Sequence, residues 1–514
     1  MADPGSVQVS LRGVVKRFGA MVAVDRADLD LRAGEVHALL GENGAGKTTL
    51  MCLLDGLYHP DQGTIEVGGR AVRFKSPRDA MRAGIGMVHQ HFMLVPTLSV
   101  AENVLLGAER IPFVLRPRAL RAKVQAAADR LGLKVDASAL VGELSVGEQQ
   151  RVELLRVLDR GARVLILDEP TAVLSPGEVD SLFEALKKLA AEGVAIVLVS
   201  HKFDEVRRIA QRVTVMRKGR VVAEMPTGVE AGRYPTDEVL AEAMVGRKVS
   251  LALDRSEVTP GEVRLEAKGL EVVGDRGLMA VRGLDLCVRA GEILGVAGVA
   301  GNGQGELFDA LAGLRPQRAG TVQLAGKDVS HASPLERARL GLRYVPADRM
   351  HTGTSPGLTV QENLLLRAYR EPPCRKGPWL HLDAARDRCQ ARIDGLQIAT
   401  TGLEQPARML SGGNLQKLVV ARELSEGVGV LLAMVPTRGL DVWATAEVRR
   451  RLLQARAAGA AVIVCSEDLD EVLALSDRVA VMRGGRFVDV LERSKADVAT
   501  VGRLMVGGAN AAGD

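Results

Sequence analysis

A glycine-rich stretch at residues 41–48, GENGAGKT, contains the residue types that bind phosphate. Its glycines let the backbone curl so that successive N–H groups point at phosphate oxygens. Lys47 supplies a positive charge for the β- and γ-phosphates, and Thr48 supplies a hydroxyl for Mg²⁺. The spacing G-x-x-x-x-G-K-[ST] predicts a nucleotide-binding loop. Together with the threonine that follows, its residues are Gly41, Glu42, Asn43, Gly44, Ala45, Gly46, Lys47, Thr48 and Thr49.

The residues around this loop predict the elements that position it. The apolar run 36–40 precedes the loop and residues 49–54 follow it, in the order strand, loop, helix. Further short runs rich in apolar residues, at 85–88, 163–167 and 194–199, each end at polar residues. Such runs separated by helices predict an α/β fold with a parallel sheet. The polar residues then gather at the carboxyl ends of the strands, where sheets of this kind bind ligands.

An antiparallel edge is expected ahead of the loop, because apolar residues alternate at Val7, Val9 and Leu11. Phe18 ends this first run. Its ring has two interpretations that the sequence leaves open: stacking on an adenine ring, or packing in the core. Residues 63–69 predict a hairpin, and residues 99–140 predict a helical stretch.

Composition excludes several classes of protein. A chain of 514 residues is too long for one ordinary core, so two or more domains are expected. Aromatic residues make up only 3%, which disfavours base-stacking platforms and predicts no nucleic-acid partner. No apolar run is long enough to span a membrane, and the first residues do not form a secretion signal. The five scattered cysteines are interpreted as packing residues in a reducing compartment.

The chain repeats itself. AGEV at 33–36 recurs as AGEI at 290–293, LS at 144–145 recurs at 410–411, and PT at 170–171 recurs at 436–437. The offset grows from 257 (290 minus 33) to 266 (410 minus 144), so the second half contains small insertions. We therefore expect two homologous domains, at 1–250 and 263–514, with a linker at 251–262.

The ordered motifs resemble those of the ABC ATPases over essentially the whole chain. They are the phosphate loop, Gln90, the signature LSVGEQ at 144–149, ILDEP at 166–170, and His201. The resemblance implies two tandem P-loop domains, each with a mixed parallel sheet, an antiparallel β edge and a helical subdomain, the first at about 91–145. Two such halves look like the importer class for simple sugars and nucleosides. GMVHQHFML at 86–94 is close to its nucleoside branch.

In that family, each nucleotide lies between the phosphate loop of one half and the signature of the other. The second signature, LSGGN at 410–414, precedes an apolar-periodic helix and offers N–H groups and a hydroxyl to a γ-phosphate. The resemblance implies that Asp168 holds Mg²⁺ with Thr48, and that Gln90 reaches the metal or the attacking water. It makes Glu169 the general base or water-orienting carboxylate. The first site would be completed by His201, at the γ-phosphate, and by Ser411, Gly412, Gly413 and Asn414.

The second site is expected to have lost its chemistry. The loop at 297–305 places Gln304 where the first loop has its lysine, and Gly305 where it has its hydroxyl. The opposing signature contains Glu148, whose carboxylate would lie near the phosphate. We predict a degenerate site that does not hydrolyse ATP, and the sequence leaves open whether this site binds nucleotide. Its residues are Gly298, Gly303, Gln304, Gly305, Ala347, Met434, Val435, Glu467, Ser145 and Gly147.

The resemblance implies an ATPase that energises an importer, with ATP and Mg²⁺ as cofactors. The solute is a nucleoside, with purine nucleosides favoured, or a simple sugar. Partners would be two integral-membrane permeases and an extracytoplasmic solute-binding protein or lipoprotein. The chain would lie at the cytoplasmic face of the membrane and touch it only through the permeases; Phe92, Met93, Leu94 and Leu98 are candidate contacts or, equally, core residues. Two alternatives stay open: a tandem ATPase acting on ribosomes and a nucleotide-sensing module.

Overall fold

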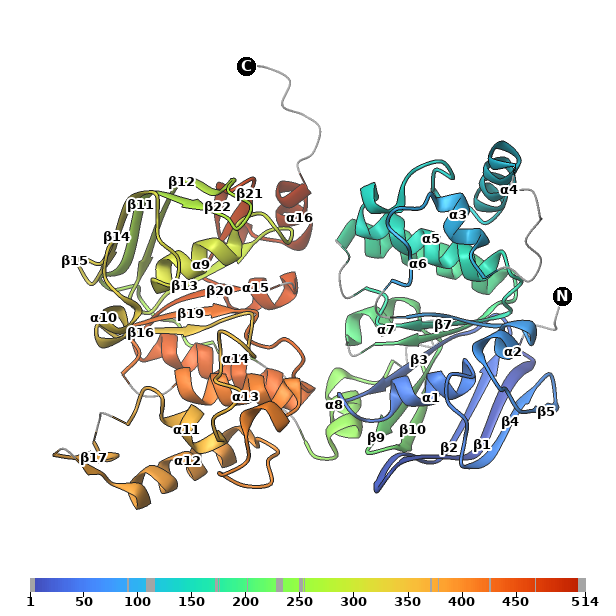
Figure 1. Ribbon diagram of the computed structural model, residues 1–514, viewed down its shortest axis with the longest axis horizontal. Helices are drawn as coiled ribbons and strands as arrows, with labels where there is room; N and C mark the ends of the chain where they lie inside the picture. The colour runs from blue at the N-terminus through green and yellow to red at the C-terminus, as the bar shows by residue number, and fades with distance from the viewer. Residues whose placement is uncertain are drawn as a thin grey trace. The chain divides into compact units, whose positions relative to one another are not determined.

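The chain forms two compact units, Met1–Ser250 and Leu251–Asp514. The computed structural model describes residues 5–89, 92–107, 116–171, 174, 176–200, 202–227, 234–248, 253, 255–369, 372–377, 379–424, 427–466 and 468–506 (Figure 1). Within these ranges, no helix is long and apolar enough to cross a bilayer.

A six-stranded sheet in the order β10-β9-β3-β8-β7-β6 is the centre of the first unit. Its strands are parallel except β10, which pairs antiparallel with β9. The central strands are buried along their whole length, which explains their continuous apolar sequences. The strands are β3 (Val36–Gly41), β6 (Ile85–Val88), β7 (Val164–Asp168), β8 (Ala195–Val199), β9 (Arg212–Arg217) and β10 (Arg220–Pro226).

A second, antiparallel sheet of four strands completes the β structure of this unit, in the order β2-β1-β4-β5. It confirms the expected antiparallel edge and the hairpin at 63–69. One apolar cluster joins β1 and β2 to helix α1 and to the six-stranded sheet, so α1 is fixed from both sides. The strands are β1 (Val7–Phe18), β2 (Met21–Arg32), β4 (Gln62–Val67) and β5 (Arg70–Val72).

The helices of the first unit fall into two groups. α1 packs toward the antiparallel sheet, and a separate apolar cluster joins α3, α4, α5 and α6 to the other face of the parallel sheet. The helices are α1 (Lys47–Leu54), α2 (Pro77–Arg82), α3 (Val100–Leu105), α4 (Pro117–Arg130), the 3-10 turn η1 (Val141–Glu143), α5 (Val146–Leu158), α6 (Pro176–Ala191), α7 (Phe203–Ile209) and α8 (Asp237–Val245).

The second unit repeats this architecture. Its six-stranded sheet has the order β16-β19-β20-β13-β21-β22, and its antiparallel sheet has the order β12-β11-β14-β15. A short extra hairpin, β17 with β18, has no counterpart among the elements described in the first unit. The strands are β11 (Val263–Val273), β12 (Met279–Arg289), β13 (Ile293–Ala297), β14 (Ala319–Leu324), β15 (Lys327–Asp328), β16 (Leu342–Val345), β17 (Arg375–Lys376), β18 (Trp379–Leu380), β19 (Val430–Met434), β20 (Ala461–Cys465), β21 (Arg478–Arg483) and β22 (Arg486–Glu492).

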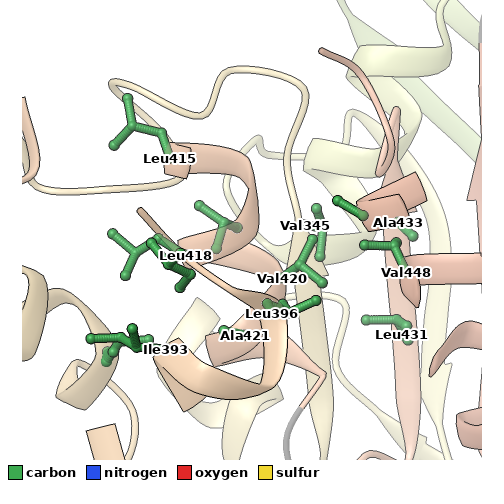
Figure 2. Close-up of a cluster of buried hydrophobic side chains, with 14 of the residues drawn as sticks. Val345, Ile393, Leu396, Leu415, Leu418, Val420, Ala421, Leu431, Ala433 and Val448 are labelled. Atoms are coloured by element: carbon green, nitrogen blue, oxygen red, sulfur yellow. The ribbon is translucent and has the colours of Figure 1, made fainter. Parts of the chain in front are cut away.

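The core of the second unit holds its signature helix in place. Leu415, Leu418 and Val420 of α13 pack toward the sheet and the neighbouring helices in one cluster (Figure 2). The helices are α9 (Gln304–Ala312), α10 (Pro334–Arg339), α11 (Val360–Leu365), α12 (Leu382–Leu396), η2 (Ala407–Met409), α13 (Gly412–Glu423), α14 (Val442–Ala457), α15 (Leu469–Leu475), η3 (Arg493–Lys495) and α16 (Val498–Val506). The predicted α/β fold with two P-loop domains is therefore confirmed.

Candidate functional site

The phosphate loop of the first unit lies between the buried strand β3 and helix α1, as the sequence predicts. Gly46 is the residue before α1, with a φ of 100°. A side chain there would be strained, and its Cβ would overlap the carbonyl oxygen of Ala23. Gly44, at a φ of 81°, also adopts the left-handed region. Glycine is thus required for the backbone to turn its N–H groups inward at the start of the helix.

Lys47 is the first residue of α1, and its side chain turns back into the loop. Its Nζ donates to the carbonyl oxygen of Gly41 at 2.7 Å and to that of Glu42 at 3.1 Å. The residue is only 6% exposed. Burial lowers the pKa of Lys47, although the carboxylates of Glu169 and Asp168 act in the opposite direction. The ammonium group is therefore held inside the loop, where it can meet phosphate oxygens.

Thr48 and Asp168 meet although 120 residues separate them, because α1 begins beside the carboxyl end of β7. The Thr48 hydroxyl donates to Asp168 Oδ2 at 3.1 Å. Burial raises the pKa of the Asp168 carboxyl, while the hydrogen bond from Thr48 lowers it. A hydroxyl and a carboxylate are hard oxygen ligands, which fit Mg²⁺ bound partly by phosphates. No cluster of three acidic, histidine or cysteine side chains exists among the described residues to hold a metal unaided.

Glu169 follows β7 in a conformation that L-residues rarely adopt, with a φ of 48°. Its N–H donates to the carbonyl oxygen of Val199, at the end of the neighbouring strand, at 3.0 Å. Val435 has the same geometry in the second unit, with a φ of 47° and an N–H bonded to Cys465 O at 2.7 Å. A valine in this region is an outlier that costs on the order of 1–3 kcal/mol. Both units therefore share the strained strand end, but only the first has a carboxylate there.

Phe18 lies at the surface, 39% exposed, so its interpretation as a core residue is wrong. Its ring meets the Tyr58 ring edge-to-face at 5.2 Å, and Lys16 Nζ lies 5.6 Å from its centroid. An exposed ring can still stack on a base. The predicted site residues Gln90, His201 and Glu467 lie outside the described residues.

The loop of the second unit repeats the backbone of the first without its functional groups. Gly303 has a φ of 102° before α9, matching Gly46 before α1. Gln304 takes the lysine position, is 5% exposed, and donates from Nε2 to Val299 O at 3.1 Å. A Cβ at Gly298 would overlap this amide. Met434 ends β19 as Asp168 ends β7, and the nearest neighbour of a Cβ at Gly305 would be the Met434 methyl group, at 3.8 Å.

The two signature turns cap their helices differently. Ser145 precedes α5, and the Glu148 carboxylate accepts its backbone N–H at 2.8 Å. That hydrogen bond lowers the pKa of Glu148, which keeps a negative charge at this helix end. Ser411 precedes α13, and its Oγ accepts from the Asn414 amide at 2.9 Å. The second signature has a neutral cap, which suits an incoming phosphate better.

Three functional candidates were missed from the sequence. Gln150 and Gln416, each 2% exposed, tie the signature helices to the loops after β7 and β19 by donating to Pro170 O at 2.7 Å and Pro436 O at 2.9 Å. In the sequence, the only signal of this role is that each glutamine lies one turn into its signature helix. Arg349 lies over Gly412, although no motif contains it. Its approach depends on a tertiary contact between residues 63 positions apart (412 minus 349).

Comparison with known proteins identifies relatives along the whole chain. The family model described as "ABC transporter" matches residues 24–172 and 281–437. The nucleoside import ATP-binding protein NupA of Lactococcus lactis subsp. cremoris is 42% identical over 97% of this chain and 98% of its own length. The glucose import ATP-binding protein TsgD13 of Haloferax volcanii is 42% identical over 98% and 96%. The guanosine import ATP-binding protein NupO of Bacillus subtilis is 42% identical over 97% of each chain.

One solved structure with a similar fold extends over both units. It is the crystal structure of the complex of archaeal ribosomal stalk protein aP1 and archaeal ribosome recycling factor aABCE1. The likeness covers 93% of this chain and 90% of that chain, with a TM-score of 0.61 and 19% sequence identity. At that identity the comparison shows the fold alone.

Proposed function

Because the chain belongs to the ABC transporter family, we propose that it is the ATP-binding and ATP-hydrolysing subunit of an importer for nucleosides or simple sugars. The observation that carries this proposal is the difference between the two loops. Lys47, Thr48, Asp168 and Glu169 are assembled in the first unit, whereas the second unit has the same backbone without any of these groups.

In this proposal one ATP is hydrolysed, between the first loop and the second signature. Lys47 and the loop N–H groups bind the phosphates, and Glu169 removes a proton from the attacking water or orients it. Gln90 and His201 complete the water and γ-phosphate contacts. The second signature contributes the hydroxyl of Ser411 and the N–H groups of the turn formed with Gly412, Gly413 and Asn414.

Mg²⁺ is the metal that this donor set fits. When bound, it neutralises charge that develops on the phosphate oxygens. Thr48 and Asp168 would hold it, with Gln90 as a further ligand. A cation there would also keep Asp168 ionised against the burial that raises its pKa.

The second site is proposed not to hydrolyse ATP. Replacing a charged donor by Gln304 removes about 1.5–3 kcal/mol of phosphate binding. Replacing a positioned base by Val435 removes a factor of ~10²–10⁴ in rate. The Glu148 carboxylate, which caps its own helix, adds repulsion toward an incoming phosphate. The stoichiometry of ATP bound per chain measures nucleotide binding at this site separately from hydrolysis.

Nucleosides, and purine nucleosides first, are the proposed solutes. The motif at 86–94 resembles the nucleoside branch, and two relatives are named for nucleoside and guanosine import. A relative named for glucose import has the same identity, 42%, so a sugar is the second candidate. Solute choice would belong to other subunits.

The proposed partners are two membrane-spanning permeases and an extracytoplasmic solute-binding protein or lipoprotein. In this proposal the chain lies at the cytoplasmic face of the membrane and contacts the permeases alone. The loop at 92–98 is the proposed contact. Met93 and Val95 are exposed there (59% and 39%), while Glu153 accepts the Met93 N–H at 2.7 Å and Arg156 donates to Met93 O at 2.7 Å. Because Glu153 and Arg156 belong to the signature helix α5, movement of that helix would reach this loop.

Met93→Asp should reduce solute uptake severalfold while the ATPase activity of the isolated chain stays within about twofold. A charge placed in an apolar contact costs binding but leaves the phosphate loop untouched. Uptake and co-purification with the permeases measure the effect, and Met21→Asp, at an equally exposed site on β2, is the matched control. Unchanged uptake would remove the loop from the contact.

A role on ribosomes is not favoured. The structural likeness to a ribosome recycling factor extends to the fold alone, whereas the import relatives share 42% identity. The test is uptake of labelled nucleosides and sugars by a deletion strain, with wild-type and Glu169→Gln chains supplied for complementation. Loss of nucleoside uptake restored by the wild type alone is the expected result. Normal uptake of every nucleoside and sugar would contradict the proposal.

A further inference from the structure

The two signature turns differ in the charges that lie against them. At residues 145–148 the neighbours are acidic: Glu148 caps the turn, and a Cβ added to Gly147 would overlap the Glu178 carboxylate. At residues 411–414 a guanidinium takes this place, because Arg349 Nη2 lies 3.0 Å from where a Cβ of Gly412 would stand. The intact signature is therefore also the one with a positive neighbour.

Arg349 bridges two loops. Its Nη1 donates to the carbonyl oxygen of Arg438 at 2.9 Å, just after β19, while its other nitrogen faces Gly412 at the start of α13. Gly439 also makes room for the guanidinium, since Nη1 lies 3.1 Å from where its Cβ would stand. Side chains at either glycine would push the arginine away. This packing couples the strand end to the signature turn through one planar group.

The backbone of Arg349 is itself held firmly. Thr354, only 6% exposed, donates its hydroxyl to Arg349 O at 2.8 Å. Asp348 accepts the N–H groups of Met350 and His351 at 2.9 and 3.0 Å, and Gly353 donates to Asp348 O at 2.8 Å. The turn that carries the arginine is thus closed on itself, which lowers the entropy cost of presenting the side chain.

The half-buried guanidinium of Arg349 lies beside another cation. Among the residues that the structure describes, no carboxylate forms an ion pair with Arg349, and the charged group that most affects it is another arginine, Arg438. Burial and this like charge lower the pKa of Arg349. A guanidinium that no described carboxylate pairs with favours the approach of an anion.

We propose that Arg349 is a positioning residue of the ATP site: it holds the signature turn at 411–413 against the loop at Gly439 and supplies the positive charge that this turn presents to the terminal phosphate. The inference rests on the proposed function, since ATP reaches this turn only when the first loop carries it there. In the first unit, Phe92 occupies the aligned position (349 minus 257 is 92), and no equivalent charge is present at that residue.

The test compares three variants of the full-length chain in steady-state ATP hydrolysis. Arg349→Gln should raise KM for ATP about 10-fold or more, the factor expected for a lost charged contact, while kcat changes less than about threefold. Arg349→Lys keeps the charge and should restore KM to within about threefold of the wild type. Arg386→Gln, the same change at an exposed site on α12, should leave both constants unchanged.

Two results would overturn the proposal. One is a KM within about twofold of the wild type in Arg349→Gln. The other is an Arg349→Lys chain as impaired as Arg349→Gln, which would show that the positive charge contributes nothing. A different measurement would contradict the proposed function. That result is retained turnover in Glu169→Gln, which is a statement about kcat and not about KM.

Discussion

Glu169→Gln is expected to lower kcat for ATP hydrolysis by ~10²–10⁴ and to leave ATP binding within a fewfold of the wild type. The amide keeps the shape of the side chain but takes up no proton, so the attacking water loses its base. Loop carbonyls hold Lys47, and Thr48 donates to Asp168, so these groups stay in place and ATP binding is expected to survive.

Steady-state phosphate release and equilibrium titration with a fluorescent ATP analogue measure the two effects. Glu178→Gln, on α6, is not a suitable control because that carboxylate lies against Gly147 of the first signature. Glu184→Gln is suitable, since its side chain is 66% exposed on the same helix and pairs with Lys187. A Glu169→Gln chain that hydrolyses ATP at more than about a tenth of the wild-type rate would show that another group performs this role.

Glu423→Gln is expected to destabilise the second unit by about 3–5 kcal/mol, the usual cost of removing one partner from a buried ion pair. Glu423 is fully buried at the end of α13 and pairs with Arg422 at 2.7 Å and Arg367 at 2.8 Å. The glutamine would leave the Arg422 guanidinium buried without its counter-charge. Arg422 also donates to Gly353 O at 2.7 Å, so the turn that carries Arg349 would loosen.

Tryptophan fluorescence during urea unfolding measures this loss selectively, because both tryptophans, Trp379 and Trp443, belong to the second unit. The midpoint should fall by about 1 M or more for a typical urea dependence. Glu404→Gln, at an exposed residue of the same unit, is the control and should shift it little. An unchanged midpoint in Glu423→Gln would mean that the pair is energetically neutral.

The direction of the Glu423 pKa shift determines how acid changes the stability that this ion pair contributes. Burial alone would raise the pKa of Glu423, but Arg422 and Arg367 outweigh it and the pKa lies below its ordinary value. The pair therefore stabilises fully above the unfolded-state pKa near 4.3, and this stabilisation is lost as the pH falls through the lower pKa of the folded state.

Local sequence was sufficient to predict the strands and the helix that position the phosphate loop. The strands before Asp168 and Ser200 were predicted to within about one residue, because each is a buried apolar run that ends at polar residues. The repeat predicted that Gln304 takes the position of Lys47, and both residues begin a helix after a left-handed glycine. The helical stretch at 99–140 was correct in type, but it is broken into α3 and α4, with residues 108–115 outside the described structure.

Contacts between segments far apart in the chain could not be predicted from the sequence. Nothing local to Arg349 indicates that its guanidinium lies on Gly412, because a pair of glycines in separate loops creates the space. The pairing of Glu423 with Arg367 across 56 residues depends in the same way on how α13 packs against its neighbours. The positive φ of Val435 also has no sequence signal, since valine is among the residues least suited to it.

The central claim is that the first loop alone drives hydrolysis, and the steady-state ATPase rate of Gln304→Ala tests it most directly. Gln304 occupies the lysine position of the second loop and donates to Val299 O within that loop. We expect the variant to retain its rate within about twofold of the wild type, whereas Lys47→Ala, the same truncation in the first loop, should lose most of it. Loss of most of the activity in Gln304→Ala would contradict the asymmetric account.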